Sequence, residues 1–249
     1  MGKSDIKRVL GSIRRADEKF GLIENGDKIA VGISGGKDSL MLLFALSIYK
    51  KFCKKDFELL AITVDLGFKP FDTSRIEEFA KSLGIEYIRV ESEIGEVVFS
   101  IRKEKNPCAL CANMRRGALN SAAKENGCNK VALAHHADDA IETLIMSLFF
   151  EGRMNTFSPR TYLSRIDLTV IRPFVFVPES ILTGCANDNE LPITNAPCPI
   201  DGKTSRQDIK DLISTLQKTY PDIKEKLLHA LDNTETYNLW DKYVADNKE

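Results

Sequence analysis

The sequence contains no long apolar run and carries almost no net charge. No stretch of its 249 residues approaches the length of a membrane span, and the Lys-rich segment Met1–Arg15 is not followed by the apolar core of a signal peptide. The formal net charge of −1 provides no overall attraction to nucleic acid. We therefore expect a soluble protein with no membrane partner, in which a polyanion would bind only at a local basic patch.

Signatures of structural disulfides and of repeats are also missing. The six cysteines are not accompanied by a signal sequence, which predicts a cytoplasmic protein whose thiols serve metal or redox chemistry. No internal repeat or low-complexity segment is present, which argues against a repeat architecture. The length suits one large α/β domain, or one domain with a small appendage.

A Walker A loop, G-x-x-x-x-G-K-[ST], is the third absence, and the chain has a different glycine-rich stretch, Ser34–Ser39. This stretch follows the extended apolar run Ile29–Ile33 and precedes a buried helix that begins with Leu40. Paired glycines allow a tight turn that exposes backbone N–H groups beside the positive end of the helix dipole. The pattern predicts a phosphate loop, and the bland alternative is a strand–helix turn that merely uses two glycines. The predicted phosphate-loop residues are Ser34, Gly35, Gly36, Lys37, Asp38 and Ser39, of which Asp38 is suited to hold Mg²⁺.

Alternating strand and helix patterns predict an α/β fold, a parallel sheet with helices on both faces. The expected strands after the first are Phe57–Asp65, Glu86–Val90, Lys130–Ala134 and Val170–Phe174. The expected helices are Asp5–Gly21, Asp72–Leu83, Ala140–Phe150, Pro178–Ala186 and a tail, Lys203–Trp240, broken near Pro221. The polar segment Arg153–Thr169 is expected to be a long excursion. We divide the chain into a leading amphipathic helix (1–26), a nucleotide-binding domain with an inserted Cys-x-x-Cys segment (27–200) and a helical tail (201–249).

Histidines and acids gather after the expected strand Lys130–Ala134, in the run His135-His136-Ala137-Asp138-Asp139. Because ligands of parallel sheets bind beyond the carboxyl ends of the strands, this run predicts an Mg-ATP or general-base site. The helix that follows places Asp138 and Glu142 on one face. The alternative is that Asp138 and Asp139 serve only as helix N-caps.

Three of the cysteines are placed as metal ligands would be. Cys108 and Cys111 form a C-x-x-C at the apparent start of a helix, and Cys198 lies far along the chain in a proline-rich loop. Three thiolates suit a [4Fe-4S] cluster that leaves one iron without a protein ligand. Zinc with a fourth ligand from Asp201 or a histidine, and a thiol–disulfide pair, are the competing interpretations. The remaining cysteines, Cys53, Cys128 and Cys185, are expected to be core residues or incidental.

Together these motifs resemble a known family. Ser-Gly-Gly-Lys-Asp-Ser resembles the PP-loop of the ATP pyrophosphatases. With His-His-x-Asp-Asp-x-x-Glu-Thr, Cys-x-x-Cys-x-x-x-Arg-Arg-Gly and the lone Cys198, it follows the order seen in the tRNA 2-thiocytidine synthetase family over roughly Asp27 to Leu231. The archaeal-type 2-thiouridine enzymes carry additional N-terminal zinc cysteines, whereas the first cysteine here is Cys53. A departure is that the second Cys-x-x-Cys is reduced to Cys198-Pro-Ile-Asp201.

The resemblance implies a PP-loop ATP pyrophosphatase (adenine nucleotide alpha hydrolase-like) fold and ATP-dependent thiolation of a tRNA cytidine. It implies that ATP adenylates the C2 oxygen of the base and that sulfide then replaces this oxygen as AMP departs. The implied cofactors are ATP, Mg²⁺ and a [4Fe-4S] cluster, and the implied partners are tRNA, a sulfur donor (sulfide or a cysteine desulfurase system) and a second copy of the chain as a homodimer. The implied cluster ligands are Cys108, Cys111 and Cys198; the catalytic residues are Lys37, Asp38, Arg115 and Asp138; and Val64, Gly117 and His135 join the phosphate loop in binding the nucleotide.

Some assignments stay open at this point. Either Asp138 or Asp139 is the catalytic acid, since helix phase cannot be fixed to one residue. The functional alternatives are a PP-loop ligase with another nucleophile, an iron–sulfur desulfurising enzyme and an iron–sulfur sensor that binds ATP. Candidate RNA contacts, each of which is also an ordinary surface charge, are Arg102, Lys103, Lys105, Arg153, Arg160 and Arg165.

Overall fold

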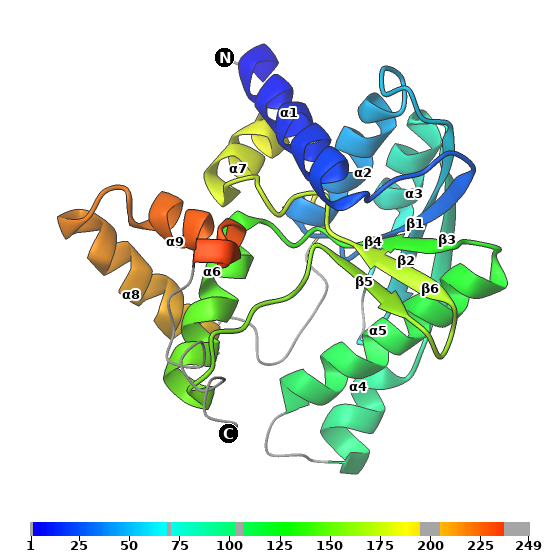
Figure 1. The fold of residues 1–249 in the computed structure, drawn as a ribbon. Coiled ribbons are helices and arrows are strands. Elements are labelled where there is room, and N and C mark those ends of the chain that lie inside the picture. The colour runs from blue at the N-terminus through cyan, green and yellow to red at the C-terminus, as the bar shows by residue number, and fades with distance from the viewer. Residues whose placement is uncertain (1, 69–70, 103–106, 195–204, 237–249) are drawn as a thin grey trace, which may run out of the picture. The chain divides into compact units, whose positions relative to one another are not determined.

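The computed structural model describes residues 2–68, 71–102, 107–194 and 205–236. A six-stranded sheet with the order β3-β2-β1-β4-β6-β5 forms the centre of this part of the chain (Figure 1). The first five strands in that order pair in parallel, and β5 joins the edge antiparallel to β6. The strands are β1 (Asp27–Ile33), β2 (Phe57–Asp65), β3 (Glu86–Glu91), β4 (Lys130–Ala132), β5 (Arg160–Leu163) and β6 (Leu168–Ile171).

Helices connect these strands and continue past the sheet. The α-helices are α1 (Gly2–Phe20), α2 (Lys37–Tyr49), α3 (Ser74–Ser82), α4 (Ile94–Glu96), α5 (Pro107–Glu125), α6 (Ala137–Met146), α7 (Glu179–Asp188), α8 (Ser205–Thr219) and α9 (Ile223–Asp232). Two π-helical turns, Val97–Arg102 and Ser147–Glu151, and a 3₁₀ turn, Thr234–Thr236, complete the set in the described residues.

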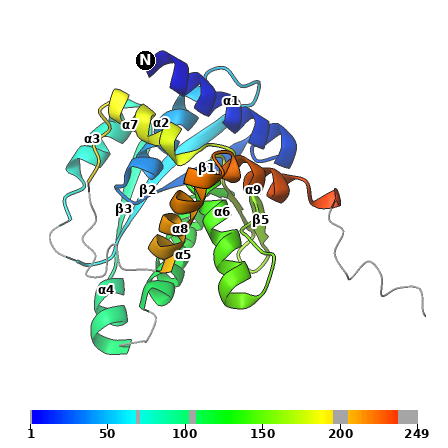
Figure 2. The ribbon, with the colours of Figure 1, turned by 90° about the vertical axis from the view of Figure 1, so that its left-hand side faces the viewer.

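The sheet is covered on both faces. On one face α2 packs on β1, and α7 contacts both α1 and α2 (Figures 1 and 2). On the other face α5 crosses the central strands, where Leu119, Ala122 and Ala123 pack against Leu60 and Ile62. Because β1 and β2 are buried on both sides, their sequences are almost continuously apolar, as parallel strands require. The α/β fold class is confirmed.

Several expected boundaries are wrong, most of them at the sheet edge. The excursion predicted over Arg153–Thr169 contains β5, whose alternating half-buried residues are too few to stand out as a periodic pattern. The strand predicted as Val170–Phe174 instead runs from Leu168 to Ile171. Pro173 has no backbone N–H, and the chain turns after Arg172, so the ladder cannot continue through it. The sheet is therefore mixed, not wholly parallel.

Two further predicted boundaries differ from the observed ones by a few residues. The strand expected to reach Ala134 ends at Ala132, and the helix expected from Ala140 begins at Ala137. That helix gives way to a π-helical turn after Met146. The chain between strand and helix, residues 133–136, is consequently an extended loop at the carboxyl end of β4.

The chain separates into two compact units. The first contains residues 1–139 and 157–201, which include the sheet; the second contains 140–156 and 202–249. In the second unit Ile141, Ile209 and Ile213 form a separate apolar cluster, and buried Glu142 pairs with Arg206 at 3.5 Å and Lys210 at 3.7 Å. The domain boundaries that we drew at residues 26 and 200 stay a prediction. Among the described helices, none is long and apolar enough to span a membrane.

Candidate active site

The phosphate loop lies at the carboxyl end of β1, as the sequence predicts. Gly35 has a φ of +85°, and a Cβ at this position would collide with the carbonyl oxygen of Thr194. The Thr194 N–H in turn donates to the Gly35 carbonyl at 3.0 Å. Ser39 Oγ accepts from the Ser34 N–H at 3.1 Å and donates to the Gly36 carbonyl at 2.9 Å. These contacts fix the turn and leave the start of α2 facing the sheet edge, where a phosphate is favoured.

Lys37 is held by two carboxylates at this helix start. Its Nζ lies 3.0 Å from both carboxylate oxygens of Asp38 and 2.9 Å from Glu179 Oε1. Burial alone would lower the pKa of Lys37, but the hydrogen bonds to Glu179 and Asp38 outweigh it and raise this pKa above the ordinary lysine value. Lys37 is therefore a fixed positive charge throughout the neutral range.

Asp138 supports this arrangement from the first turn of α6, the helix that follows the neighbouring strand β4. Its Oδ2 accepts the backbone N–H of Glu179 at 2.7 Å, and its side chain is buried. Asp139 instead makes local contacts at the start of α6, since its Oδ2 accepts the His136 N–H at 3.0 Å while its own N–H donates to His136 Nδ1 at 3.3 Å. Asp138 is thus connected to Lys37 through Glu179; the choice between the two acids as catalytic residue stays a prediction.

Three groups near Lys37 could hold a metal ion. Ligand atoms of Asp38, His136 and Glu179 all lie within 4.8 Å of one another. The sequence singles out Asp38 for Mg²⁺ and places buried His136 in the run predicted to form an Mg-ATP or general-base site, but it does not single out Glu179. Glu179 is 142 residues from Lys37 in the sequence, so no local motif joins the two residues. The sequence indicates only that Glu179 is an acid in the first turn of a predicted helix.

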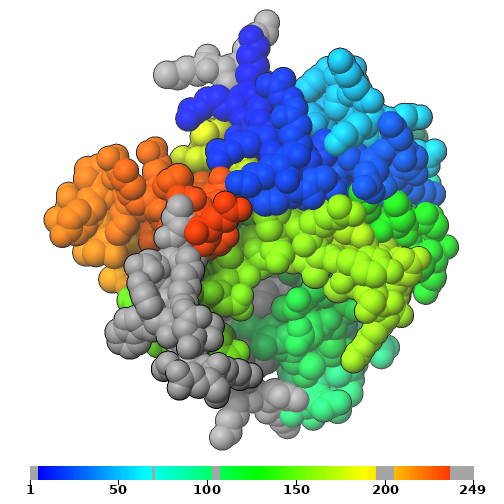
Figure 3. Space-filling view, in the orientation of Figure 1, coloured from blue at the N-terminus to red at the C-terminus, as the bar shows by residue number. Residues whose placement is uncertain are grey.

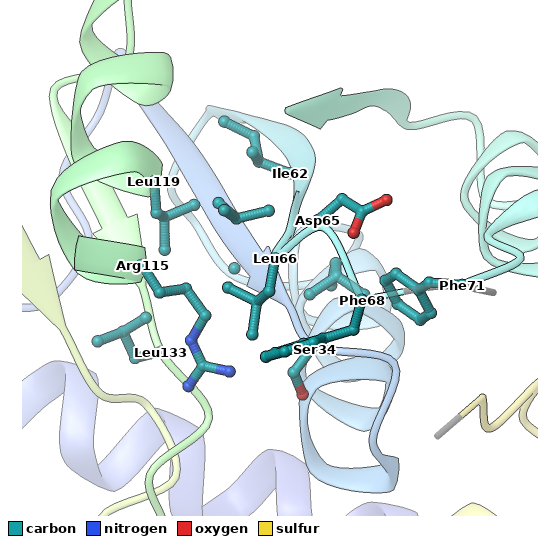
Figure 4. A pocket seen from close by; sticks show the side chains of 12 residues that line it. Ser34, Ile62, Asp65, Leu66, Phe68, Phe71, Arg115, Leu119 and Leu133 are labelled. Atoms are coloured by element: carbon teal, nitrogen blue, oxygen red, sulfur yellow. The ribbon is translucent and has the colours of Figure 1, made fainter. Parts of the chain in front are cut away.

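A pocket adjoins the phosphate loop on the α5 face of the sheet (Figure 4). Ser34, Val64 and Arg115 line it as predicted site residues, and the Arg115 side chain extends from α5 toward Ser34 (Figure 4). Gly117 is exposed on α5 and does not line the pocket. The remaining lining residues are mostly apolar: Gly32, Ile33, Ile62, Asp65, Leu66, Phe68, Phe71, Leu119 and Leu133. An apolar cavity beside a phosphate loop suits a purine base.

His135 lies apart from the metal-capable group. Its ring is half-buried and its centroid is 5.0 Å from that of Phe157, which lies three residues before β5. The neighbouring His136 rather than His135 therefore faces Asp38 and Glu179. The role in nucleotide binding that we predicted for His135 stays a prediction.

The two cysteines of the C-x-x-C motif lie in the first turns of α5. Cys108 is exposed and Cys111 is half-buried, and a spacing of three residues places them on one side of the helix. Arg115 follows one turn after Cys111 and reaches the pocket, so one helix links the thiols to that cavity. Cys198, the third predicted ligand, lies outside the described residues. Cys128 and Cys185 are buried, as expected, and Cys53 is partly buried.

Only some of the candidate RNA contacts can be located. Arg102, Arg153, Arg160 and Arg165 are exposed. Arg160 approaches Glu24 at 3.9 Å. Lys103 and Lys105 lie outside the described residues. All six stay predictions.

Comparison with known proteins identifies the family. Residues 7–214 match the family model described as a PP-loop domain. The chain is 36% identical over 241 residues to the tRNA-cytidine(32) 2-sulfurtransferase of Geobacter sulfurreducens, covering 94% of this chain and 93% of the relative. The protein of the same name from Syntrophotalea carbinolica is 37% identical, covering 97% and 93%. The chain belongs to the PP-loop tRNA-cytidine(32) 2-sulfurtransferase family.

A solved tRNA thiolase structure is also similar to this chain. The U34-tRNA thiolase NcsA from Methanococcus maripaludis, solved with its [4Fe-4S] cluster, superposes with a TM-score of 0.77 and 26% identity. The match covers 95% of this chain and 81% of that protein. The family resemblance predicted from the motifs is confirmed, and the chain is an enzyme of the tRNA sulfurtransferase class.

Proposed function

We propose that this chain replaces the C2 oxygen of a tRNA cytidine with sulfur, at the position 32 named for its relatives, in a reaction driven by ATP. The observation that carries the proposal is the arrangement of α5, which bears Cys108 and Cys111 at its start and sends Arg115 into the pocket beside the phosphate loop. Because thiols and an ATP-type site meet along one helix, sulfur delivery and base activation can occur at one centre.

The phosphate loop and its carboxylates would bind Mg²⁺-ATP. Phosphate oxygens would replace Asp38 and Glu179 as partners of Lys37 Nζ, while the two carboxylates turn to Mg²⁺. Their oxygen atoms suit this ion, which prefers carboxylate and water ligands. Asp138 would hold Glu179 in place through its bond to the Glu179 N–H. The base of ATP would enter the apolar cavity near Val64.

The first chemical step would be transfer of AMP to the cytidine. The C2 oxygen of the base forms a bond to the α-phosphorus of ATP, the bond to the bridging oxygen breaks, and pyrophosphate leaves. Lys37 and the start of α2 would stabilise the negative charge on the phosphates. Arg115, which already points into the pocket, would neutralise charge on the activated base oxygen. The target base must be unstacked to reach this site.

The donor set fits a cluster held by three thiolates. Cys108 and Cys111 project from the same side of the start of α5, and Cys108 is open to solvent and hence to an incoming ligand. With Cys198 as third ligand, a bound [4Fe-4S] cluster would supply an iron position without a protein ligand, able to bind sulfide. The sulfur donor that we propose is sulfide, delivered free or by a cysteine desulfurase system. A cytoplasmic location and a homodimer complete the proposal.

Sulfur incorporation and pyrophosphate release test this function together. Anaerobically purified wild-type protein with ATP, Mg²⁺, labelled sulfide and unmodified tRNA is expected to release pyrophosphate only when tRNA is present and to label the tRNA. Cys108→Ser is expected to abolish labelling. Labelling without ATP would instead favour sulfur exchange or desulfurisation, and RNA-independent pyrophosphate release with no labelling would favour another PP-loop ligase.

A further inference from the structure

Arg172 is a buried cation at the carboxyl edge of the sheet. It directly follows β6, and the residue is only 8% exposed. Its Nη1 donates to the Ser158 carbonyl oxygen at 2.6 Å and, at 3.4 Å, to Thr161 Oγ1. Its Nε is fully buried and has no hydrogen-bond partner in the described part of the chain. Within the residues that the structure describes, no carboxylate forms an ion pair with Arg172.

The surroundings of Arg172 are aromatic and cationic. Its guanidinium carbon lies 5.1 Å from the centre of the Phe157 ring, and the same ring contacts the ring of His135. Burial, and after it the charge of Arg116 on α5, lowers the pKa of Arg172 to about 10, which leaves it protonated at neutral pH. Arg116 is exposed and donates to Asn113 Oδ1 at 2.7 Å. The charge of a second cation, on the helix that carries the cysteines, thus acts on Arg172.

A buried guanidinium without a counter-ion is costly. An unsatisfied buried charge loses its hydration without the compensating attraction of a partner, so proteins normally pair such groups. The backbone oxygen and the hydroxyl that Arg172 contacts are neutral and compensate only part of this loss. A ligand that brings a negative charge to Arg172 would compensate the rest of this loss.

We propose that Arg172 and Arg116 bind a backbone phosphate of the RNA substrate beside the stacking surface of Phe157. This proposal rests on the proposed tRNA function and adds to it a contact outside the nucleotide site. Arginine suits the role because its planar fork can bind a phosphate through two donors. An aromatic ring next to the cations suits an unpaired base flanking the target cytidine.

The position of Arg172 favours RNA over the phosphates of ATP. The strand β4 separates β6 from β1, and the ATP phosphates have donors of their own at the end of β1. In the space-filling view the surface is hollowed between the segment with β5 and β6, in yellow-green, and the green segment with α4 and α5 (Figure 3). Arg172 and Arg116 come from these two segments. An RNA strand carries further phosphates beyond the base that reacts, so RNA is the ligand that would need cations outside the nucleotide pocket.

Equilibrium binding of a labelled anticodon stem–loop RNA, which carries the substrate cytidine, tests the assignment. We expect Arg172→Met to weaken RNA binding about tenfold and to reduce the salt dependence of binding by about one phosphate contact. Arg116→Gln is expected to weaken binding by a smaller factor. The affinity for Mg²⁺-ATP without RNA should be unchanged in both variants. The control is Arg14→Gln, which removes an exposed arginine of α1 and should leave RNA binding as in wild type.

Stability and the remaining outcomes separate this role from others. The melting temperature of Arg172→Met should equal or exceed that of wild type, because the variant removes an uncompensated buried charge. If the wild-type protein thiolates tRNA but Arg172→Met and Arg116→Gln bind RNA as tightly as wild type, the phosphate-binding role of these arginines is overturned and the proposed function still stands. Loss of ATP affinity with RNA binding unchanged would assign Arg172 to the nucleotide. If Arg172→Met fails to fold, Arg172→Lys and the exposed Arg116→Gln decide: wild-type RNA affinity in both overturns the proposal. Wild-type protein that binds no RNA would overturn the proposed function as well.

Discussion

The two ends of the same sheet use buried charge in opposite ways. At the amino end, Lys130 is 2% exposed and its Nζ lies 2.7 Å from Asp27, 3.1 Å from Glu24 and 3.0 Å from the Leu22 carbonyl oxygen. At the carboxyl end, Lys37 is part-exposed between two acids, and Arg172 is buried with no acid among the described residues. Charges at the amino end are satisfied by the protein itself. We propose that Lys37 and Arg172 at the carboxyl end are arranged for a ligand, because ligands of parallel sheets bind beyond this end of the strands.

The largest effect should follow from removing Lys37. We expect Lys37→Met to lower RNA-dependent pyrophosphate release about 10³-fold, because this charge stabilises the phosphates as pyrophosphate leaves. The melting temperature should change by little, since the carboxylates that Lys37 leaves behind are reached by water. A large loss of stability with activity preserved would break the comparison, because Lys37 would then be structural like Lys130.

Lys130 should show the reverse behaviour. Lys130→Met leaves buried Asp27 without its cation, and we expect a loss of about 3 kcal/mol in the free energy of unfolding, measured by urea denaturation. The double variant Lys130→Met/Asp27→Asn should recover much of this loss, since it removes both charges. Per folded molecule, catalysis by either variant should match wild type. A stable Lys130→Met protein with impaired ATP binding would contradict the division of roles.

Glu179 sharpens the comparison within the carboxyl end. Glu179→Gln removes one of the two carboxylates that pair with Lys37 and that we propose to hold Mg²⁺, and because a magnesium ligand is lost we expect the KM for Mg²⁺-ATP to rise about tenfold, or ~1.4 kcal/mol. The Gln side chain keeps the volume, so stability should be preserved. Glu179→Asp is the matched variant that retains the charge and should recover part of the affinity. Equal KM values in all three proteins would remove Glu179 from the site.

The smallest effect concerns pH. The raised pKa of Lys37 keeps it protonated well above neutrality, so its contribution to folding and to ATP binding is fully present below its unfolded pKa and is lost only as pH rises through the folded value. We therefore expect that titration of Lys37 does not change the affinity for Mg²⁺-ATP, measured by calorimetry between pH 7 and pH 9. A decline across this range that Lys37→Arg abolishes would show that the lysine titrates there.

Local patterns carried most of what could be predicted. The phosphate loop, α2 and the C-x-x-C helix follow from glycine spacing and apolar periodicity within a short stretch of chain. Glu179 and Arg172 could not be predicted, because their roles arise from contacts with residues far away along the chain and, for Arg172, from the short strand β5. The pocket beside the phosphate loop shows the same limit, since Phe68 and Phe71 line it from a loop without a sequence signature.

Metal and sulfide content is the most direct test that the carboxyl end is a sulfur-transfer centre. Iron and acid-labile sulfide would be measured, with a visible spectrum, on anaerobically purified wild type and on Cys108→Ala, Cys111→Ala and Cys198→Ala. Cys128→Ala, which changes a buried cysteine outside the motif, is the control. About four irons per chain in wild type and the control, lost in each of the three other variants, is the predicted result. One zinc and no iron would contradict the account.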